Sequence, residues 1–297
     1  MPAAEVAAQG SGPAASRAGT IELGGEVSAV RLGFGAMRLP GVWGAPNDPQ
    51  QARRLLRRVI ELGVNVIDTA HAYGPEVSER LIAEALHPYP QELIVATKGG
   101  YGRRGPHRWA ADGRPETIRR HCQRSLELLR LERIDLLQLH TVDPAVPIEE
   151  SVGAIVDLQG EGKVRMIGVS NVSVEELERA RAVGEIASVQ NRYNLGDRES
   201  EDVLAVCEGA GIAFLPWFPL GSGALAGAGE LQAVASAHGA TAAQVAIAWL
   251  LQRSPVLLPI PGTASIAHLE ENTAAAGLRL SAEEFGRLST LVGHPRA

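Results

Sequence analysis

The stretch VNVIDTAHAYGPEVSERLIAEALHPYPQELIVATK, residues 64–98, carries the pattern that decides the fold. It begins with a short apolar run, VNVID, and ends with a second one, LIVATK. Between them, SERLIAEAL (78–86) has apolar residues at helical spacing. Short, mostly apolar runs of this kind are typical of strands that are buried on both faces of a parallel sheet. The stretch therefore predicts a strand, a helix and a second, parallel strand.

The same alternation continues along the chain on both sides of this stretch. Candidate strands are RLGFG (31–35), VNVID (64–68), LIVATK (93–98), IDLLQLH (134–140), RMIGVS (165–170), ASVQN (187–191), IAFLPW (212–217) and VLLPI (256–260). Candidate helices span 48–63, 78–86, 115–130, 147–162, 173–183 and 241–253, and several begin at a Ser, Thr, Asp or Pro start signal. Eight strand–helix units without a linker predict an α/β fold, the (β/α)8 TIM barrel.

A doubly wound sheet is the alternative α/β fold, but GFGAM after the first strand lacks the full G-x-G-x-x-G spacing of a phosphate turn. The stretch TIELGGEVSAV (20–30) predicts a β-hairpin around its Gly-Gly pair, and we expect this hairpin to close the bottom of the barrel. Residues 1–19 are rich in Ala, Gly, Ser and Pro and predict a disordered tail. A single barrel domain over 20–297 is expected to follow.

Composition excludes several classes of protein. The 297 residues are 45% hydrophobic and 21% charged, with a formal net charge of −6 and no basic run, so a nucleic-acid partner is not expected. The sequence shows neither a secretory signal nor a run of roughly 18 apolar residues, so no membrane contact is expected either. Cys122 and Cys207 lie far apart and fit a reducing compartment. The expected location is cytoplasmic, and no hydrophobic stripe indicates a dimer.

Lysine is rare in this chain, which makes its position informative. Of 28 basic residues only Lys98 and Lys163 are lysine. Lys98 directly follows a buried run, where a charge needs a partner or a use. The lysine ammonium is compact and its pKa changes readily on burial. We therefore expect a specific role for Lys98, and a solvated loop position for Lys163.

Four polar residues are expected at the carboxyl ends of the strands, where barrel enzymes keep their active sites. Asp68 could cap the following turn or pair with Lys98. Tyr73 follows in the next loop, and a nearby cation would lower the pKa of its phenol from about 10. His140 ends IDLLQLH and is either structural or placed to orient a carbonyl group. Together they predict a proton donor with the groups that tune it.

Two other kinds of site use residues from the same region. A metal centre could be assembled from His71, His140, Asp68 and Asp143, but no H-x-H or H-E-x-x-H spacing supports it. A Ser-His-Asp hydrolase is unsupported, because the chain lacks a G-x-S-x-G turn. We therefore expect no metal.

Later strand ends suggest the partner of the proton donor. Ser170, Asn171 and Gln190 offer groups that can hold a carboxamide, and Trp217 offers a flat face for a planar ring. The segments PLGSG and IPGTAS supply small residues and hydroxyls near a helix start, which suits phosphate. These features predict a nicotinamide dinucleotide site without a Rossmann fold.

Seven motifs in order resemble the aldo-keto reductase family: GVNVIDTAHAYGPEVSERLIAEAL, LIVATKGG, IDLLQLH, IGVSN, VQNRYN, PLGSG and IPGTASIAHLEEN. The resemblance covers nearly the whole chain from residue 20. It implies a (β/α)8 barrel that reduces a small-molecule aldehyde or ketone with NADPH and without metal. It also implies a catalytic tetrad of Asp68, Tyr73, Lys98 and His140, in which Lys98, held by Asp68, lowers the pKa of the proton donor Tyr73.

The resemblance further implies a cofactor site. Its residues would be Gly35, Met37, Asp68, Ser170, Asn171, Gln190, Trp217, Phe218, Pro219, Leu220, Gly221, Ile260, Gly262, Thr263, Ser265, His268, Glu271 and Asn272. Phe218 stands where the family often has a serine, and Gly262 and His268 stand where it often has a Lys or Arg near the 2′-phosphate. NADPH is therefore the expected cofactor, with NADH possible.

A narrower resemblance concerns the substrate. AMRLPGVWGAPND, EALHPYP, PWFPLG and QNRYN are similar to a bacterial pyridoxal reductase branch, which suggests pyridoxal, although related reductases act on sugars, terpenoid aldehydes or polyketide ketones. The implied substrate residues are Trp43, Tyr73, Trp109 and His140. The loop 99–115 is either a flexible surface loop or a lid that lays Trp109 over the substrate. Two alternative functions stay open, a cofactor-binding regulatory subunit with little turnover and an internal-redox isomerase.

Overall fold

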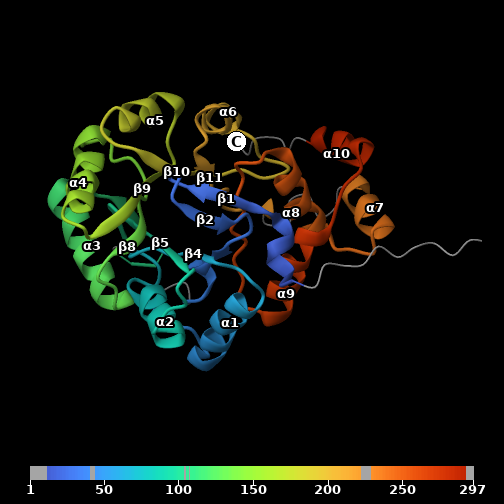
Figure 1. The fold of residues 1–297 in the computed structure, drawn as a ribbon, viewed down its shortest axis with the longest axis horizontal. Helices are drawn as coiled ribbons and strands as arrows, with labels where there is room; N and C mark the ends of the chain where they lie inside the picture. The colour runs from blue at the N-terminus through green and yellow to red at the C-terminus, as the bar shows by residue number, and fades with distance from the viewer. Residues whose placement is uncertain (1–11, 41–43, 104, 107, 222–228, 292–297) are drawn as a thin grey trace, which may run out of the picture.

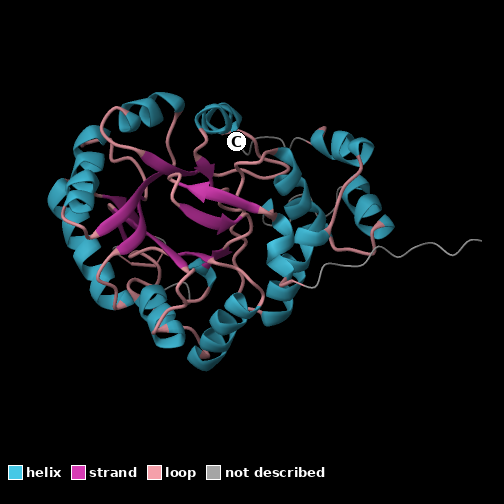
Figure 2. Cartoon of the chain, viewed as in Figure 1, coloured by secondary structure: helices cyan, strands magenta, loops and turns pink. Residues whose placement is uncertain are grey.

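In a computed structural model the chain forms a curled sheet of parallel strands surrounded by helices, as Figures 1 and 2 show. The structure describes residues 12–40, 44–103, 105–106, 108–221 and 229–291. The strands of the main sheet are β3 (Phe34–Gly35), β4 (Val66–Asp68), β5 (Ile94–Gly99), β8 (Ile134–Leu139), β9 (Val164–Ser170), β10 (Ile186–Gln190) and β11 (Ala213–Phe214). They lie in the order β11-β10-β9-β8-β5-β4-β3, and each neighbouring pair is parallel.

Helices follow the strands along the chain, and most of them cover the outside of the sheet. They are α1 (Pro49–Glu61), α2 (Val77–Leu86), α3 (Pro115–Leu129), α4 (Ile148–Gly160), α5 (Val174–Arg181), α6 (Glu201–Ala210), α7 (Gly229–Ala237), α8 (Ala242–Arg253), α9 (Ile266–Ala274) and α10 (Ala282–Ser289). Local chemistry sets several of their starts: Asp48 caps α1 before Pro49, and capping boxes begin α5, α8 and α10. Figure 1 shows α7 and α10 outside the ring that the other helices form.

The eighth predicted strand, 256–260, closes the barrel without forming a regular strand. Only Leu257 makes a β-bridge, to Phe214. Backbone hydrogen bonds nevertheless link this segment to β11 on one side, where Leu258 donates to Phe214 (2.9 Å), and to the first strand on the other, where Gly33 donates to Pro259 (2.9 Å). Prolines 259 and 261 have no N–H group, so the segment cannot sustain a full ladder. The predicted (β/α)8 barrel is confirmed, and this one strand is irregular.

The N-terminal hairpin closes the bottom of the barrel, as predicted. Strands β1 (Thr20–Leu23) and β2 (Val27–Val30) pair antiparallel. Leu23 and Ala29 belong to the same buried cluster as the inward-facing residues of the barrel, including Leu136 and Met166. Asn65, just before β4, accepts a hydrogen bond from the Val30 N–H (2.8 Å) and fixes the hairpin at the amino-terminal end of the strands. The open end of the barrel is therefore the carboxyl end.

The predicted tail over 1–19 is wrong for its last residues. Ala14–Ala18 form a 3-10 helix in which Ala15 and Ala18 are buried. The Ala15 N–H donates to the carbonyl of Leu62 at the end of α1 (3.0 Å). Small alanines allow this close approach, which a prediction from composition alone misses. The remainder of the predicted tail, 1–11, lies outside the described residues.

In the described part of the chain, no single helix is long and apolar enough to cross a membrane. Helices α7 and α8 together reach the required length and composition, but their axes are bent by 91°.

Candidate active site

The ends of β4 and β5 bring three of the four predicted catalytic side chains into contact. The Lys98 ammonium donates to Asp68 Oδ2 (2.6 Å), to the Thr69 carbonyl (2.9 Å) and to the Tyr73 hydroxyl (3.3 Å). Lys98 is 1% exposed and Asp68 2%. A buried ammonium needs this many partners, because desolvation of an unpaired charge is costly. The expected pairing of Asp68 with Lys98 is therefore present, and Tyr73 is its third member.

Two glutamines hold the other oxygen of the same carboxylate. Asp68 Oδ1 accepts from the amide of Gln190 (2.8 Å) and from that of Gln138 (3.2 Å). The nitrogen of Gln190, expected to face a carboxamide, is thus engaged within the barrel. Gln138 was missed by the sequence reasoning, although a lone glutamine inside the apolar run IDLLQLH is a signal that could have found it. Together these bonds fix the rotamer of Asp68.

Burial and the neighbouring charged groups both shift the pKa values of Lys98 and Tyr73. Burial would lower the pKa of Lys98, but the Asp68 carboxylate and the Tyr73 hydroxyl outweigh it and raise that pKa. Burial raises the pKa of the Tyr73 phenol above its ordinary value of 10.0, and the Lys98 charge only partly opposes the rise. Lys98 lowers the pKa of Tyr73, as expected, but burial outweighs this effect and the net pKa is raised. The depth of burial cannot be read from the sequence.

His140 stands beside this group and is neutral. Burial, and then the charge of Lys98, hold its pKa well below the ordinary value of 6.5. Its ring lies nearly perpendicular to that of Tyr73, with centroids 5.9 Å apart. The buried Nδ1 atom has no hydrogen-bond partner among the described residues. A neutral imidazole next to a phenol can take part in a hydrogen bond to a carbonyl oxygen. The side chains of Asp68, Tyr73, Lys98 and His140 thus lie close together.

The next strand ends form a second hydrogen-bonded group, which is joined to the backbone of His140. The amide nitrogen of Asn171 donates to the His140 carbonyl (3.0 Å) and to Ser170 Oγ (3.1 Å), and Asn171 Oδ1 accepts from the indole N–H of Trp217 (2.9 Å). Asn171 has φ 57°, a left-handed conformation that asparagine tolerates. Four predicted residues, Ser170, Asn171, Gln190 and Trp217, therefore lie together, because Ser170 Oγ donates to the Gln190 carbonyl (2.6 Å).

The loop after Trp217 makes a tight turn. Phe218 has φ 59°, and the Gly221 N–H donates to its carbonyl (3.0 Å). The amide of Asn194 also donates to the Phe218 carbonyl (3.1 Å). Pro219 is buried and Leu220 is half-buried within this turn. The Phe218 carbonyl is therefore held by two hydrogen bonds within this turn.

The loop before α9 approaches the first strand closely. A Cβ on Gly35 would lie 2.6 Å from the Ile260 carbonyl oxygen, and one on Gly262 would lie 2.6 Å from the Gly35 carbonyl oxygen, so both positions require glycine. Ser265 caps α9 by accepting from the His268 N–H (3.4 Å). The Thr263 and Ser265 hydroxyls thus lie at a helix start, the arrangement expected for phosphate.

The residues expected at the far end of the cofactor differ in their surroundings. Glu271 accepts a hydrogen bond from the Thr241 hydroxyl (2.5 Å) and is tied to α8. Asn272 is buried and His268 is exposed. Met37, after the first strand, is 56% exposed. The structure therefore places Met37 and His268 at accessible positions, and ties the Glu271 side chain to protein.

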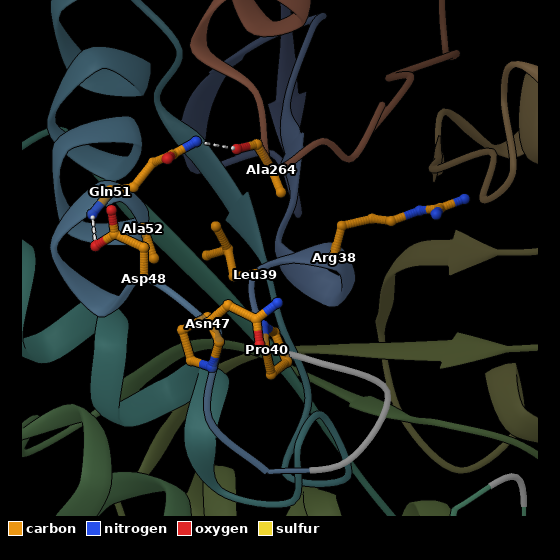
Figure 3. Close-up of a pocket in the computed structure, with 9 residues that line it drawn as sticks. Arg38, Leu39, Pro40, Asn47, Asp48, Gln51, Ala52 and Ala264 are labelled. Atoms are coloured by element: carbon orange, nitrogen blue, oxygen red, sulfur yellow. Dashed lines mark hydrogen bonds between the residues drawn. The ribbon is translucent and has the colours of Figure 1, made fainter.

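A cavity of about 280 Å³ opens between the loop after β3, the start of α1 and Ala264. Gln51 bridges it by donating to the Ala264 carbonyl (3.2 Å). Figure 3 shows that the Arg38 side chain points away from Gln51 and Asp48. Its stem instead packs toward Gly262, where a Cβ would lie 3.7 Å from Arg38 Cγ. Arg38, which the sequence reasoning did not single out, therefore has the stem of its side chain beside Gly262, in the loop that was expected to hold phosphate.

The loop 99–115 contains a second hairpin. Strands β6 (Tyr101–Arg103) and β7 (Trp109–Ala111) pair antiparallel, so this part of the loop has regular structure. The Trp109 ring lies 6.2 Å from that of His140 and 5.2 Å from that of Tyr101. Trp109 and Tyr101, the latter missed by the sequence reasoning, therefore both lie beside His140. The other expected wall residue, Trp43, lies outside the described residues.

The residues of the alternative metal site are engaged separately. His71 stacks on His121 with centroids 4.1 Å apart, and Asp143 accepts from the Gly113 N–H (3.0 Å). Among the described residues no group of three or more His, Cys, Asp or Glu side chains is arranged to hold a metal ion.

Comparison with known proteins places this site in a family. Residues 31–292 match the Aldo/keto reductase family. An uncharacterized oxidoreductase of Schizosaccharomyces pombe is 47% identical over 277 residues, 92% of this chain and 90% of that protein. Pyridoxine 4-dehydrogenase of Escherichia coli is 42% identical over 280 residues, 92% of this chain and 97% of that protein. An aldo-keto reductase of Klebsiella pneumoniae in complex with NADPH has a TM-score of 0.78 at 28% identity, over 93% of this chain and 96% of that one.

The chain therefore belongs to the Aldo/keto reductase family and is an oxidoreductase of that family. The predicted family is confirmed.

Proposed function

We propose that this protein reduces an aldehyde or ketone to the alcohol with NADPH, using Tyr73 as the proton donor. One observation carries the proposal: the buried Lys98 ammonium contacts both the Asp68 carboxylate and the Tyr73 hydroxyl. This arrangement places a fixed cation in contact with the phenol. A buried ion pair contributes little net stability. Stability alone therefore does not explain the Asp68–Lys98 pair.

The electrostatics suit a general acid. Burial raises the pKa of Tyr73 and keeps the phenol protonated at neutral pH, ready to donate. As the proton leaves, the adjacent Lys98 charge stabilises the phenolate that forms. Neutral His140 would orient the carbonyl oxygen toward the Tyr73 hydroxyl. When bound, the reduced nicotinamide supplies the hydride.

The residues of this chain fit the cofactor in three places. Ser170, Asn171 and Trp217 already form a connected polar group beside His140, where a carboxamide and a planar ring would be held. The turn at Phe218–Gly221 would follow the pyrophosphate. The hydroxyls of Thr263 and Ser265 lie at the start of α9, where the helix dipole favours phosphate. The family member of known structure that binds NADPH supports this assignment.

The loop before α9 has no Lys or Arg of its own near the expected 2′-phosphate, and Arg38 can supply this positive charge. Gly262 leaves room for the Arg38 stem, which lies beside that loop: a Cβ on Gly262 would be 3.7 Å from Arg38 Cγ. In the part of the chain that the structure describes, Arg38 forms no ion pair with a carboxylate. We propose that its guanidinium contacts the 2′-phosphate and favours NADPH over NADH.

Pyridoxal is the first candidate substrate. The 42% identical relative is named a pyridoxine 4-dehydrogenase, and its similarity to this protein covers 92% of the chain. Residues 20–297 would act as one barrel domain. The cytoplasmic location expected from the sequence stays part of this proposal, and the two free buried cysteines support it.

The direct test is the initial rate of NADPH oxidation with pyridoxal and with 4-nitrobenzaldehyde. Tyr73→Phe should reduce the rate by about 10²–10⁴-fold, the contribution of a positioned acid. Tyr89→Phe removes a distant hydroxyl, which donates to the Leu129 carbonyl (2.7 Å), and is the matched control. Tight NADPH binding without turnover of either aldehyde would move the assignment to a regulatory subunit or an internal-redox isomerase.

A further inference from the structure

Two aromatic side chains of the β6–β7 hairpin lie parallel beside the tetrad. The rings of Tyr101 and Trp109 have centroids 5.2 Å apart and planes 14° apart. The backbone register pairs Trp109 with Arg103 and Tyr101 with Ala111, so the two rings are diagonal neighbours across the hairpin. The guanidinium carbon of Arg103 lies 4.6 Å from the centre of the Trp109 ring, a cation–π contact that helps to hold the indole. Tyr101, Trp109 and Arg103 therefore pack together on one side of the hairpin.

Both rings turn toward His140. Tyr101 lies 5.0 Å from it at 66°, and Trp109 lies 6.2 Å from it at 68°. His140 in turn meets Tyr73 at 5.9 Å and 85°. The hairpin rings thus continue the wall of the site outward from the proton donor. A carbonyl compound whose oxygen meets the Tyr73 hydroxyl has its carbon substituent beside this wall.

The hairpin is anchored where it joins the barrel. The Gly100 N–H donates to His121 Nδ1 (3.2 Å), and the Gly100 carbonyl accepts from the Asp112 N–H (2.9 Å). Gly100 has φ 82°, and a Cβ there would lie 2.7 Å from Ile118 Cδ1, so the backbone fits tightly on α3. Burial lowers the pKa of His121 to about 4, which keeps Nδ1 free to accept at neutral pH. The aromatic wall is therefore in place before a substrate arrives.

We propose that Tyr101 is a specificity-determining residue, and that Tyr101 with Trp109 selects carbonyl compounds in which the carbonyl carbon is attached to a planar aromatic ring. This rests on the proposed reductase function and names the substrate class of the same site. A flat ring can stack on the wall or meet its edge, and such ring contacts stabilise a complex beyond the burial of area alone. A saturated ring of equal carbon count cannot lie flat against it.

The test compares benzaldehyde with cyclohexanecarboxaldehyde, which have the same carbon skeleton but differ in planarity. In Tyr101→Leu, kcat/KM for benzaldehyde should fall about tenfold relative to cyclohexanecarboxaldehyde, the value of one lost ring contact plus its burial. Tyr101→Phe should keep the wild-type preference, because the ring and not the hydroxyl carries it. The dissociation constant of NADPH, measured by fluorescence titration, separates a local effect from disruption of the barrel mouth.

Equal losses for both aldehydes in Tyr101→Leu, or no loss for either, would overturn the proposal. A wild type that reduces neither aldehyde would defeat the reductase function but still leave the wall testable. For that reason calorimetric binding of benzyl alcohol and cyclohexylmethanol to protein saturated with NADP⁺ is measured in parallel. Preference for benzyl alcohol in the wild type that disappears in Tyr101→Leu supports the wall, and equal binding of the two alcohols contradicts it.

Discussion

The ammonium of Lys98 lies 2.6 Å from the carboxylate of Asp68, and the two side chains are 0% and 3% exposed. This ion pair joins the ends of two adjacent strands, β4 and β5, at the open end of the barrel. Because Gln138 and Gln190 hold the second carboxylate oxygen, the ammonium has a fixed position from which its remaining hydrogen bond reaches Tyr73. Lysine at the end of LIVATK thus supplies a compact charge at one point, which the forked guanidinium of arginine could not do in the same space.

Replacement of Lys98 by methionine should remove the positive charge that stabilises the phenolate of Tyr73. We expect kcat to fall by about 10²–10⁴-fold, because the phenolate loses its stabilising charge. The free energy of unfolding should also fall by about 3–5 kcal/mol, since Asp68 keeps a buried charge without its partner. Lys163→Met is the matched control, because the only other lysine is half-buried at a loop and pairs with Glu161. Steady-state kinetics and urea unfolding measure the two effects, and normal turnover in Lys98→Met would contradict the role of Lys98.

The pH dependence of reduction should be flat across the neutral range. Reduction requires protonated Tyr73, whose pKa is raised above 10, so the rate is retained at lower pH and falls only as the pH rises past that raised value. His140 has a pKa well below 6.5 and stays neutral through the same range. We therefore expect constant kcat/KM between pH 6.5 and 9. A titration near pH 6.5 that disappears in His140→Asn would show instead that the histidine is charged during the reaction.

Sequence patterns predicted those features that depend on neighbours along the chain or on the geometry of a barrel. The alternation of apolar runs and helices predicted the (β/α)8 barrel, and the rule that strand ends converge predicted that Asp68, Tyr73, Lys98 and His140 lie at one end of it. The apolar run at 256–260 predicts a strand, but Pro259 has no N–H group to donate and the segment is irregular. Gln138 was missed because its partner, Asp68, is 70 residues away. The raised pKa of Tyr73 depends on burial by the whole barrel, which no local pattern reports.

Arg38 provides a test of cofactor preference. In Arg38→Gln, kcat/KM with NADPH should fall about tenfold or more, the value of a lost hydrogen bond between charged groups. The value with NADH should change much less, because NADH has no 2′-phosphate. Arg53→Gln removes an arginine that pairs with Glu84 between α1 and α2, and serves as the control. Equal losses with both cofactors would place Arg38 at the pyrophosphate.

Glu79 makes stability depend on pH through a buried carboxyl group. Its side chain accepts from the Thr97 hydroxyl (2.7 Å), while Oε2 has no partner among the described residues. Burial raises its pKa from 4.5 to about 7, so the folded state holds a proton that the unfolded state has already released. Stability from this group is therefore present below pH 4.5 and is lost as the pH rises to about 7.

Between pH 5 and pH 8 the free energy of unfolding should fall by about 2–3 kcal/mol more in the wild type than in Glu79→Gln. Glutamine keeps the hydrogen bond to Thr97 but does not titrate, so the two proteins differ only in the proton. Urea unfolding at both pH values measures the difference. Glu127→Gln is the matched control, because Glu127 is an exposed carboxylate on α3 that pairs with Arg124. Parallel pH dependence in the wild type and Glu79→Gln would mean that Glu79 is already ionised in the folded protein at pH 5.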